Sequence, residues 1–314
     1  MVPLHTGHNH LPVANSFFDL LGYWELSPYI LVSLFFVLMG YCLGRSRLIN
    51  RIKYPIVFRG PMRWMCLLAY LTALGTLVLA LVSPISRYST DLFFVHMIQH
   101  MLLIMVAAPL LLLSDPMALY LWGMPQSARH WLGRMVRPSG LPRQLIKAMT
   151  VPVIAWLLFV VTIAVWHTPV AYNAALSRDY LHAFEHISMF GVAILFWWPV
   201  IGSAPLRSSL PYPLRFLYLF MALFQNIILG AILTFGNGPV YSYYEGAPNH
   251  WGITPDFDQQ LGGIIMWIPG SMMFFGVISI LLFIWLEQEE TRNIKYRRDE
   301  ETRRRFLHAK LTSE

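Results

Sequence analysis

Two histidine pairs are the residues in this sequence most able to do chemistry. They form His-x-x-Gln-His at His96–His100 and His-x-x-Glu-His at His182–His186, and both lie inside long apolar runs. Because an α-helix turns once in 3.6 residues, residues four positions apart share one face, and Gln99 and Glu185 lie on the same faces as the histidines. Ionisable side chains at membrane depth are costly, so these pairs indicate a functional site, here for a metal ion or haem.

The composition identifies the class of protein that must position these pairs. Of 314 residues, 56% are hydrophobic and only 12% are charged, which is typical of an integral membrane protein and leaves no room for a large soluble domain. We expect an all-α membrane protein with seven transmembrane helices in residues 28–286, an N-terminal tail at 1–27 and a charged tail at 287–314. About 20 apolar residues cross a bilayer, and seven stretches qualify: Pro28–Gly44, Met65–Pro84, Leu92–Leu113, Pro152–His167, Tyr180–Ile201, Leu214–Phe235 and Gly262–Leu286.

The distribution of Lys and Arg predicts the orientation in the membrane. The segments that follow the first, third, fifth and seventh stretches hold 21 of the 23 basic residues, and only Arg87 and Arg178 lie on the other side. Cytoplasmic loops carry the excess of basic residues, so the N-terminus is expected outside and the C-terminus in the cytoplasm. The net charge of +7 is therefore a topology signal, and it does not indicate nucleic-acid binding.

This orientation gathers the histidines at one surface. Both pairs lie in the first two turns of inward-running helices, His167 ends the fourth stretch on the outside, and His250 lies in the outer loop Gly236–Leu261. The tail adds three more, as a metal-capturing segment or simply a polar end: His5, His8 and His10. Only His130 and His308, of eleven histidines, are expected on the cytoplasmic side.

A weak internal repeat indicates that the two histidine pairs are equivalent. Ser83-Pro84 ends the second stretch twelve residues before the first pair, and Thr168-Pro169 follows the fourth stretch thirteen residues before the second pair. Duplicated helical hairpins related by an axis along the membrane normal would produce this pattern.

The ligand hypothesis follows from the two pairs taken together. A single membrane histidine is often only an interhelical hydrogen-bonding residue, and this interpretation stays open for His167. Two pairs at equal depth favour one shared site, and we expect five imidazoles to converge there: His96, His100, His182, His186 and His167.

Five further residues are expected to support this site. Gln99 and Glu185 would orient the imidazoles, as metal-bound histidines usually require. Met266 lies near the outer end of the seventh stretch, where a thioether is a candidate ligand. His250 and Asp258 lie in the long loop Gly236–Leu261. A loop of this length is usually functional, and we expect this one to cover the site as a lid.

Three kinds of function remain open on the residues alone. Copper is the divalent ion that imidazole sites bind most tightly, and Cu(I) also accepts thioether sulfur. Zinc takes the same nitrogen ligands, and a zinc hydrolase would use Glu185 as its base, although no nucleophile or oxyanion motif is visible. A haem protein would use axial histidines, but the membrane histidines all lie at one depth, which disfavours a transmembrane electron path.

Several motifs follow one another in order along residues 90–270: Phe93–Leu103, Ala108–Leu110, Trp166–Pro169, His182–His186, Phe196–Pro199, Pro239–Tyr241 and Asp258–Gly270. Together they resemble the polytopic CtaG-like assembly factors of cytochrome c oxidase. This resemblance implies a non-catalytic, multi-pass protein of a bacterial-type cytoplasmic membrane that supplies or protects copper for the oxidase. The implied partners are oxidase subunits, extracytoplasmic copper chaperones and membrane lipid.

Overall fold

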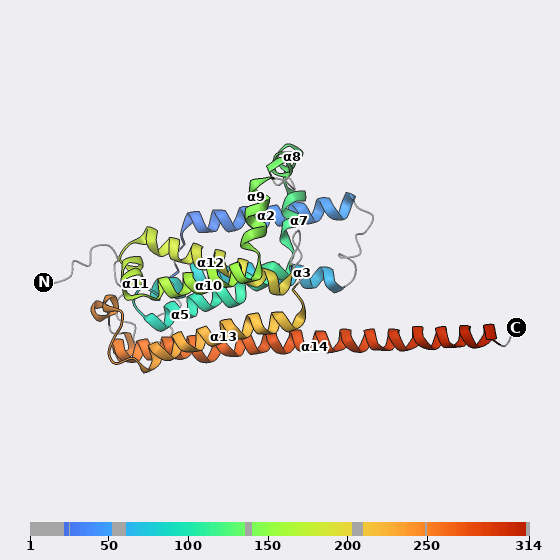
Figure 1. Ribbon diagram of the computed structural model, residues 1–314. Coiled ribbons are helices and arrows are strands. Elements are labelled where there is room, and N and C mark those ends of the chain that lie inside the picture. The colour runs from blue at the N-terminus through green and yellow to red at the C-terminus, as the bar shows by residue number, and fades with distance from the viewer. Residues whose placement is uncertain are drawn as a thin grey trace.

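Long helices run side by side and form the body of the molecule (Figure 1). The computed structural model describes residues 22–311 except 25, 52–60, 136–139, 203–209 and 249, so the histidines of the N-terminal tail lie outside the described residues. All regular elements in the described part are helical. The long elements are α2 (Pro28–Arg51), α3 (Pro61–Leu81), α5 (Phe93–Met101), α10 (Pro152–Trp166), α12 (Asp179–Ile201), α13 (Tyr212–Phe235) and α14 (Pro255–Leu311).

Six helices in the described residues are long and apolar enough to cross a membrane, which makes the chain a multi-pass membrane protein. The predicted fourth span, Pro152–His167, corresponds to α10, whose 15 residues rise about 22 Å, against about 30 Å of hydrocarbon. A seventh span is reached only when α10 is joined to α9 (Leu141–Met149), which meets it at 72°. Pro152 explains the bend, because proline lacks an N–H group and holds Val151 in an extended conformation.

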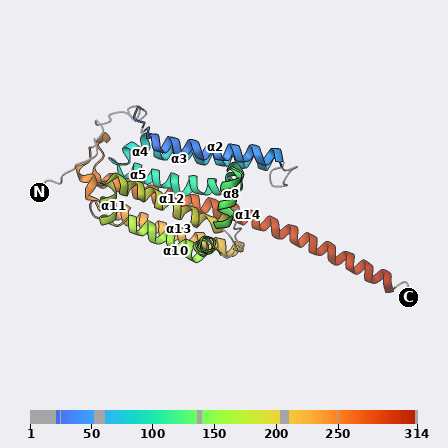
Figure 2. The same ribbon diagram turned by 90° about the horizontal axis from the view of Figure 1, so that it is seen from above.

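The last helix runs from the bundle into the charged C-terminal segment. α14 has 57 residues and is therefore about 85 Å long. Its final part leaves the bundle at the end opposite to α11 (Pro169–Leu176), as both ribbon views show (Figures 1 and 2). Ion pairs within the helix, Arg292–Glu289 and Arg304–Glu300, join side chains one turn apart on this exposed segment.

The two expected hairpins share their local structure. The helix α3 leads through the short α4 (Pro84–Tyr88) to α5, and α10 leads through α11 to α12. Each short helix begins with proline, and the residue before that proline caps the helix with its hydroxyl. Ser83 accepts from Ile85 N at 3.1 Å, and Thr168 accepts from Ala171 N at 3.4 Å. Each hairpin thus delivers a histidine pair at the start of its second long helix.

A distant carboxylate holds the start of α5 in place. Asp258 accepts hydrogen bonds from Phe93 N at 2.7 Å and from Phe94 N at 2.9 Å, which satisfies free N–H groups and matches the positive end of the helix dipole. Gly262, one turn further along α14, has no room for a side chain, because a Cβ atom there would come within 2.3 Å of the Phe93 ring. Helix α14 therefore fixes both the position and the end of the helix that carries the first pair.

The helix after the first histidine pair is widened. A π-helical segment, η2 (Leu102–Ala107), joins α5 to α6 (Ala108–Leu113). Pro109 lies at the beginning of α6, and its ring would clash with the carbonyl four residues earlier in a regular α-helix. Trp197 of α12 donates its indole N–H to the Ile104 carbonyl of the widened segment at 2.8 Å. Such π-helical insertions are frequent at functional sites.

An apolar core lies deeper along the same helices. Phe196 stacks on Phe159 at 4.3 Å and on Tyr218 at 4.9 Å between ring centroids, and Trp197 stacks on Phe274 at 6.0 Å. These buried rings come from α10, α12, α13 and α14. They pack together in a part of the bundle separate from the start of α5 and α12, where the histidine pairs lie.

Candidate metal centre

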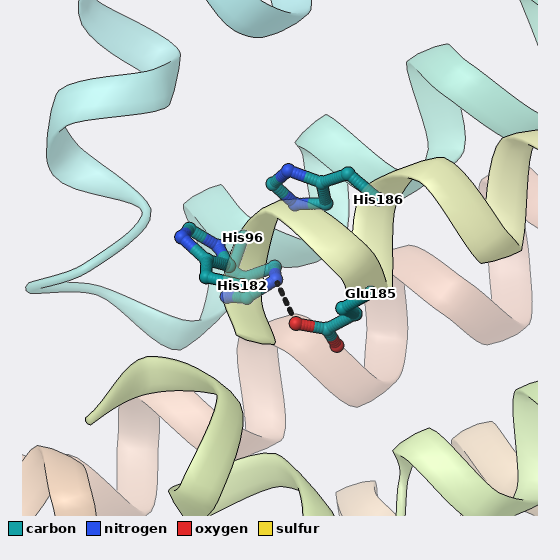
Figure 3. A group of neighbouring side chains, drawn as sticks. All are labelled: His96, His182, Glu185 and His186. Carbon is teal, nitrogen blue, oxygen red and sulfur yellow. Dashed lines mark ion pairs between the residues drawn. The ribbon is translucent and has the colours of Figure 1, made fainter. Parts of the chain in front are cut away.

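Four side chains from α5 and α12 form a compact donor group. Each of His96, His182, Glu185 and His186 offers one ligand atom, and these atoms all lie within 4.8 Å of one another. Figure 3 shows the three imidazoles and the carboxylate directed toward a common region between the two helices. Three imidazole nitrogens and one carboxylate oxygen are a suitable donor set for Zn²⁺ or Cu²⁺.

The remaining histidine of the first pair lies against this group. His100 Nε2 is 2.8 Å from His96 Nε2, and its ring centroid is 5.3 Å from that of His186. The two oxygens of Glu185 lie 3.8 Å from the Nε2 atoms of His96 and His100. The four membrane histidines of the two pairs therefore converge around one carboxylate.

His167, from the end of α10, is the fifth histidine of the site. Its ring centroid is 6.3 Å from that of His100. Its Nδ1 is 2.8 Å from the Ile163 carbonyl oxygen, which can only accept a hydrogen bond. The proton is therefore on Nδ1, and Nε2 presents a lone pair.

A tyrosine from the outer loop fixes the tautomer of His96 in the same way. Burial raises the pKa of Tyr244 well above its usual range, so this hydroxyl keeps its proton. The hydroxyl donates that proton to the Ser89 carbonyl at 3.0 Å and can then only accept from Tyr172 OH at 3.0 Å and His96 Nδ1 at 3.3 Å. His96 thus carries its proton on Nδ1 and directs the Nε2 lone pair toward the cluster.

Several polar atoms of the site are buried without a hydrogen-bond partner among the described residues. They are Glu185 Oε1 and Oε2, His100 Nδ1, His167 Nε2 and His186 Nε2. A buried polar group without a partner costs roughly 1–3 kcal/mol, and a buried charge costs more. A cation bound in the donor group would satisfy the Glu185 carboxylate and the His186 nitrogen, so these residues fit a metal ion.

Gln99 has a structural contact in place of the expected contact with an imidazole. Its amide donates to the Ala80 carbonyl of α3 at 2.8 Å. That carbonyl has no helical donor, because the residue four positions later is Pro84, which lacks an N–H group. Gln99 therefore closes the end of α3, whereas Glu185 at the equivalent position lies inside the donor group.

The other expected accessory residues lie around the site at different places. Asp258 caps α5, as described above, and acts through that helix. His250 lies in η4 (His250–Gly252), buried, with Nε2 3.1 Å from Asp91 Oδ2, so it ties the outer loop to the segment before α5. Met266 lines a cavity beside His100 and His167.

Sequence reasoning missed the tyrosines that orient the histidines. Tyr244 lies in η3 (Ser242–Gly246), and Tyr172 lies in α11, 72 positions away in the chain. The Tyr172 ring centroid is 5.3 Å from that of His96. One feature of the sequence could have indicated them. Three tyrosines lie within Tyr241–Tyr244, which is an unusual density of aromatic hydroxyls for a loop at the histidine end of the molecule.

Comparison with known proteins agrees with the motifs of the two histidine helices. A protein of Mycobacterium bovis and one of Mycobacterium tuberculosis, both uncharacterised, are each 31% identical over 242 residues, which is 74% of this chain. An uncharacterised protein of Mycobacterium leprae is 29% identical over 232 residues, or 71% of this chain. The chain spans about a third of the length of these relatives, since the matches cover 34–35% of them. No solved structure matches.

A match to a protein family covers most of the chain. Residues 39–288, which include both hairpins and the outer loop, match the family described as cytochrome c oxidase caa3 assembly factor. This confirms the resemblance seen in the motifs. The chain belongs to the family of cytochrome c oxidase caa3 assembly factors.

Proposed function

We propose that this protein binds a copper ion at the cluster of His96, His182, Glu185 and His186 and makes it available for the maturation of a cytochrome c oxidase. The ion is cargo, and the protein is not an enzyme. The observation that carries the proposal is the buried carboxylate of Glu185, whose two oxygens lie among imidazole nitrogens and have no hydrogen-bond partner in the part of the chain that the structure describes.

Charge balance supports a cation at this position. A carboxylate excluded from water is strongly destabilised unless it is paired with a positive charge or binds a metal ion. The tautomer of His96, fixed by Tyr244, turns a lone pair toward the same point. The helices therefore hold the donors close together, and an ion would replace the hydrogen bond that His96 Nε2 accepts from His100 Nε2.

The ligand types and the packing of the rings favour copper over the alternatives. Copper has the highest affinity of the divalent series for nitrogen and oxygen donors. Zinc would also fit, and only measurement separates the two ions. A haem is less suited, because the rings of His96 and His186 are 5.6 Å apart and nearly perpendicular, which leaves no slot for a flat macrocycle between them.

The proposal includes a location and partners. The excess of Lys and Arg in alternate segments supports an outer location for the histidine end, in a bacterial-type cytoplasmic membrane. Copper would arrive there from extracytoplasmic chaperones and leave to an oxidase subunit. Family membership supports the oxidase as the final recipient.

Alanine variants in cells test the function. His100→Ala and His186→Ala should insert normally, because insertion depends on the summed apolar content of each span. We expect normal amounts of oxidase subunits and haem, with low oxidase activity and copper-depleted active centres. Added copper should restore part of the activity, because mass action refills a weakened site.

His130→Ala is the matched control, because His130 lies in α8 (Gln126–Met135) and is exposed. It should leave oxidase activity unchanged. Normal oxidase activity in both His186→Ala, which removes a cluster member, and His100→Ala, which removes the imidazole bonded to His96, would refute the proposed function if the protein level is normal.

A further inference from the structure

A small cavity lies beside the donor group, deeper along α5. Its volume is about 30 Å³, above the roughly 10–15 Å³ that one water-sized occupant needs. Four thioethers and two imidazoles line it: Met97, Met101, Met105, Met266, His100 and His167. We propose that this cavity is a second metal site, selective for a soft monovalent cation of the Cu(I) class.

The ordinary interpretation is that these methionines only fill space in the core, as methionine often does. Two buried nitrogens speak against it. His167 Nε2 presents a lone pair, because Nδ1 donates to the Ile163 carbonyl. Neither this atom nor His100 Nδ1, which is also buried, has a hydrogen-bond partner among the described residues. Empty cavities that stay dry are lined by apolar groups alone, whereas this one has two imidazoles in its wall.

The donor chemistry of the cavity differs from that of the Glu185 cluster. No carboxylate lines the cavity among the described residues. Thioether sulfur with imidazole nitrogen suits Cu(I), whereas carboxylate oxygen suits harder ions. The protein therefore offers a charged, nitrogen-and-oxygen site and a neutral, sulfur-and-nitrogen site side by side.

His100 belongs to the walls of both sites. Its Nε2 is 2.8 Å from His96 Nε2 in the donor group, and the same side chain lines the cavity. The cavity proposal does not depend on copper binding by the Glu185 cluster, and it involves no redox step, because the ion enters and stays as Cu(I).

The backbone around the cavity is held firmly enough to keep its shape. Asn226 of α13, also in the wall, donates to the Met266 carbonyl of α14 at 2.7 Å. Gly270 of α14 brings the helix close to α5, since a Cβ atom there would be 2.8 Å from Asn226 Nδ2 and 3.3 Å from Met101 Cε. These contacts hold α13 and α14 together and bring α14 close to Met101 of α5.

The test uses the purified full-length protein in detergent with three probes. Cu(I) under a reductant is titrated against a chromophoric Cu(I) chelator, Ag(I) serves as a redox-inert analogue, and Zn(II) serves as a harder probe. The double variant Met97→Leu/Met101→Leu keeps the volume of the side chains and removes two thioethers. We expect it to weaken Cu(I) and Ag(I) binding by about tenfold or more, since even outer partners of a metal site change affinity by about 10–100-fold.

Two controls separate this site from the Glu185 cluster and from general damage. Met189→Leu changes a buried methionine of α12 that does not line the cavity, and it should leave Cu(I) affinity unchanged. Glu185→Gln should weaken Zn(II) binding and leave the Ag(I) equivalent in place. X-ray absorption of the Cu(I) protein should show sulfur neighbours, which the double variant loses.

The contrary results are equally distinct. Cu(I) bound only by nitrogen or oxygen in the unmodified protein, or unchanged Cu(I) affinity in the double variant, would overturn the proposal. If the double variant fails to fold, the single variant Met266→Leu on α14 takes its place and is judged by the same two measurements. Failure of Zn(II) binding in the unmodified protein would count against the Glu185 cluster and leave the cavity proposal standing.

Discussion

The two hairpins that carry the histidine pairs differ in how they satisfy a carbonyl group at the end of their first helix. Pro84 and Pro169 each follow a long helix, and each leaves a carbonyl four residues earlier, on Ala80 or Val165, without its helical donor. In the second hairpin Val165 O accepts from the backbone N–H of Thr168 at 3.1 Å and from its hydroxyl at 2.7 Å. In the first, the side chain of Gln99 reaches across from α5 to Ala80 O at 2.8 Å.

This difference gives Gln99 and Glu185, the equivalent residues of the two histidine patterns, different roles. Because Thr168 satisfies its helix end locally, α12 has no need of an amide at position 185, and a carboxylate occupies it. The first hairpin uses the same position for structure, and its histidine pair is deeply buried, with His96 at 0% and His100 at 4% exposed. One hairpin thus builds the wall of the site, and the other provides its negative charge.

The largest expected effect is on metal affinity through Glu185. The variant Glu185→Gln keeps the size of the side chain and removes the charge, so Cu(II) or Zn(II) affinity should fall by about 100-fold, the upper end for partners of a metal site. Competition with a chromophoric chelator measures this affinity. An affinity within twofold of the unmodified protein would mean that the carboxylate is not a ligand.

The corresponding change on the other hairpin should act on stability. Gln99→Leu removes the donor of the buried Ala80 carbonyl, which is 0% exposed, and should lower the free energy of unfolding by about 1–3 kcal/mol. Metal affinity should change far less than in Glu185→Gln. Thermal unfolding in detergent measures the loss of stability. An unchanged unfolding temperature with a large loss of metal affinity would mean that Gln99 serves metal binding and not the structure.

A smaller effect is expected at the loop tyrosine that orients the buried pair. Tyr244→Phe removes the acceptor of His96 Nδ1, so the imidazole loses its fixed tautomer and metal affinity should fall by about tenfold. Tyr70→Phe is the matched control, because its buried hydroxyl bonds to Val37 O at 2.9 Å, away from the site. Equal affinities for the two variants would show that the outer loop does not tune the cluster.

The sequence predicted the parts of this architecture that depend on local spacing. Residues four apart on a helix share a face, and this alone brought His96 with His100 and His182 with His186. The repeat at Ser83-Pro84 and Thr168-Pro169 likewise appeared as two equivalent helix caps. Family membership followed from motifs in the same order along the chain.

The parts that depend on contacts between distant residues could not be predicted in this way. Asp258 caps a helix 165 positions earlier in the chain, and Tyr244 reaches His96 across 148 positions. Nothing in the pattern around Gln99 shows that its amide serves Ala80, because that need arises from Pro84 on another element. The bend between α9 and α10 was not predicted either, since apolar composition does not reveal it.

The most direct test of the central claim is the metal content of the purified protein, measured together with its visible spectrum. After exposure to copper and removal of weakly bound ions, the unmodified protein should retain copper and show no haem Soret band, and Glu185→Gln should retain less copper. A Soret band from the isolated protein, or equal copper in both proteins, would contradict a copper site built around Glu185.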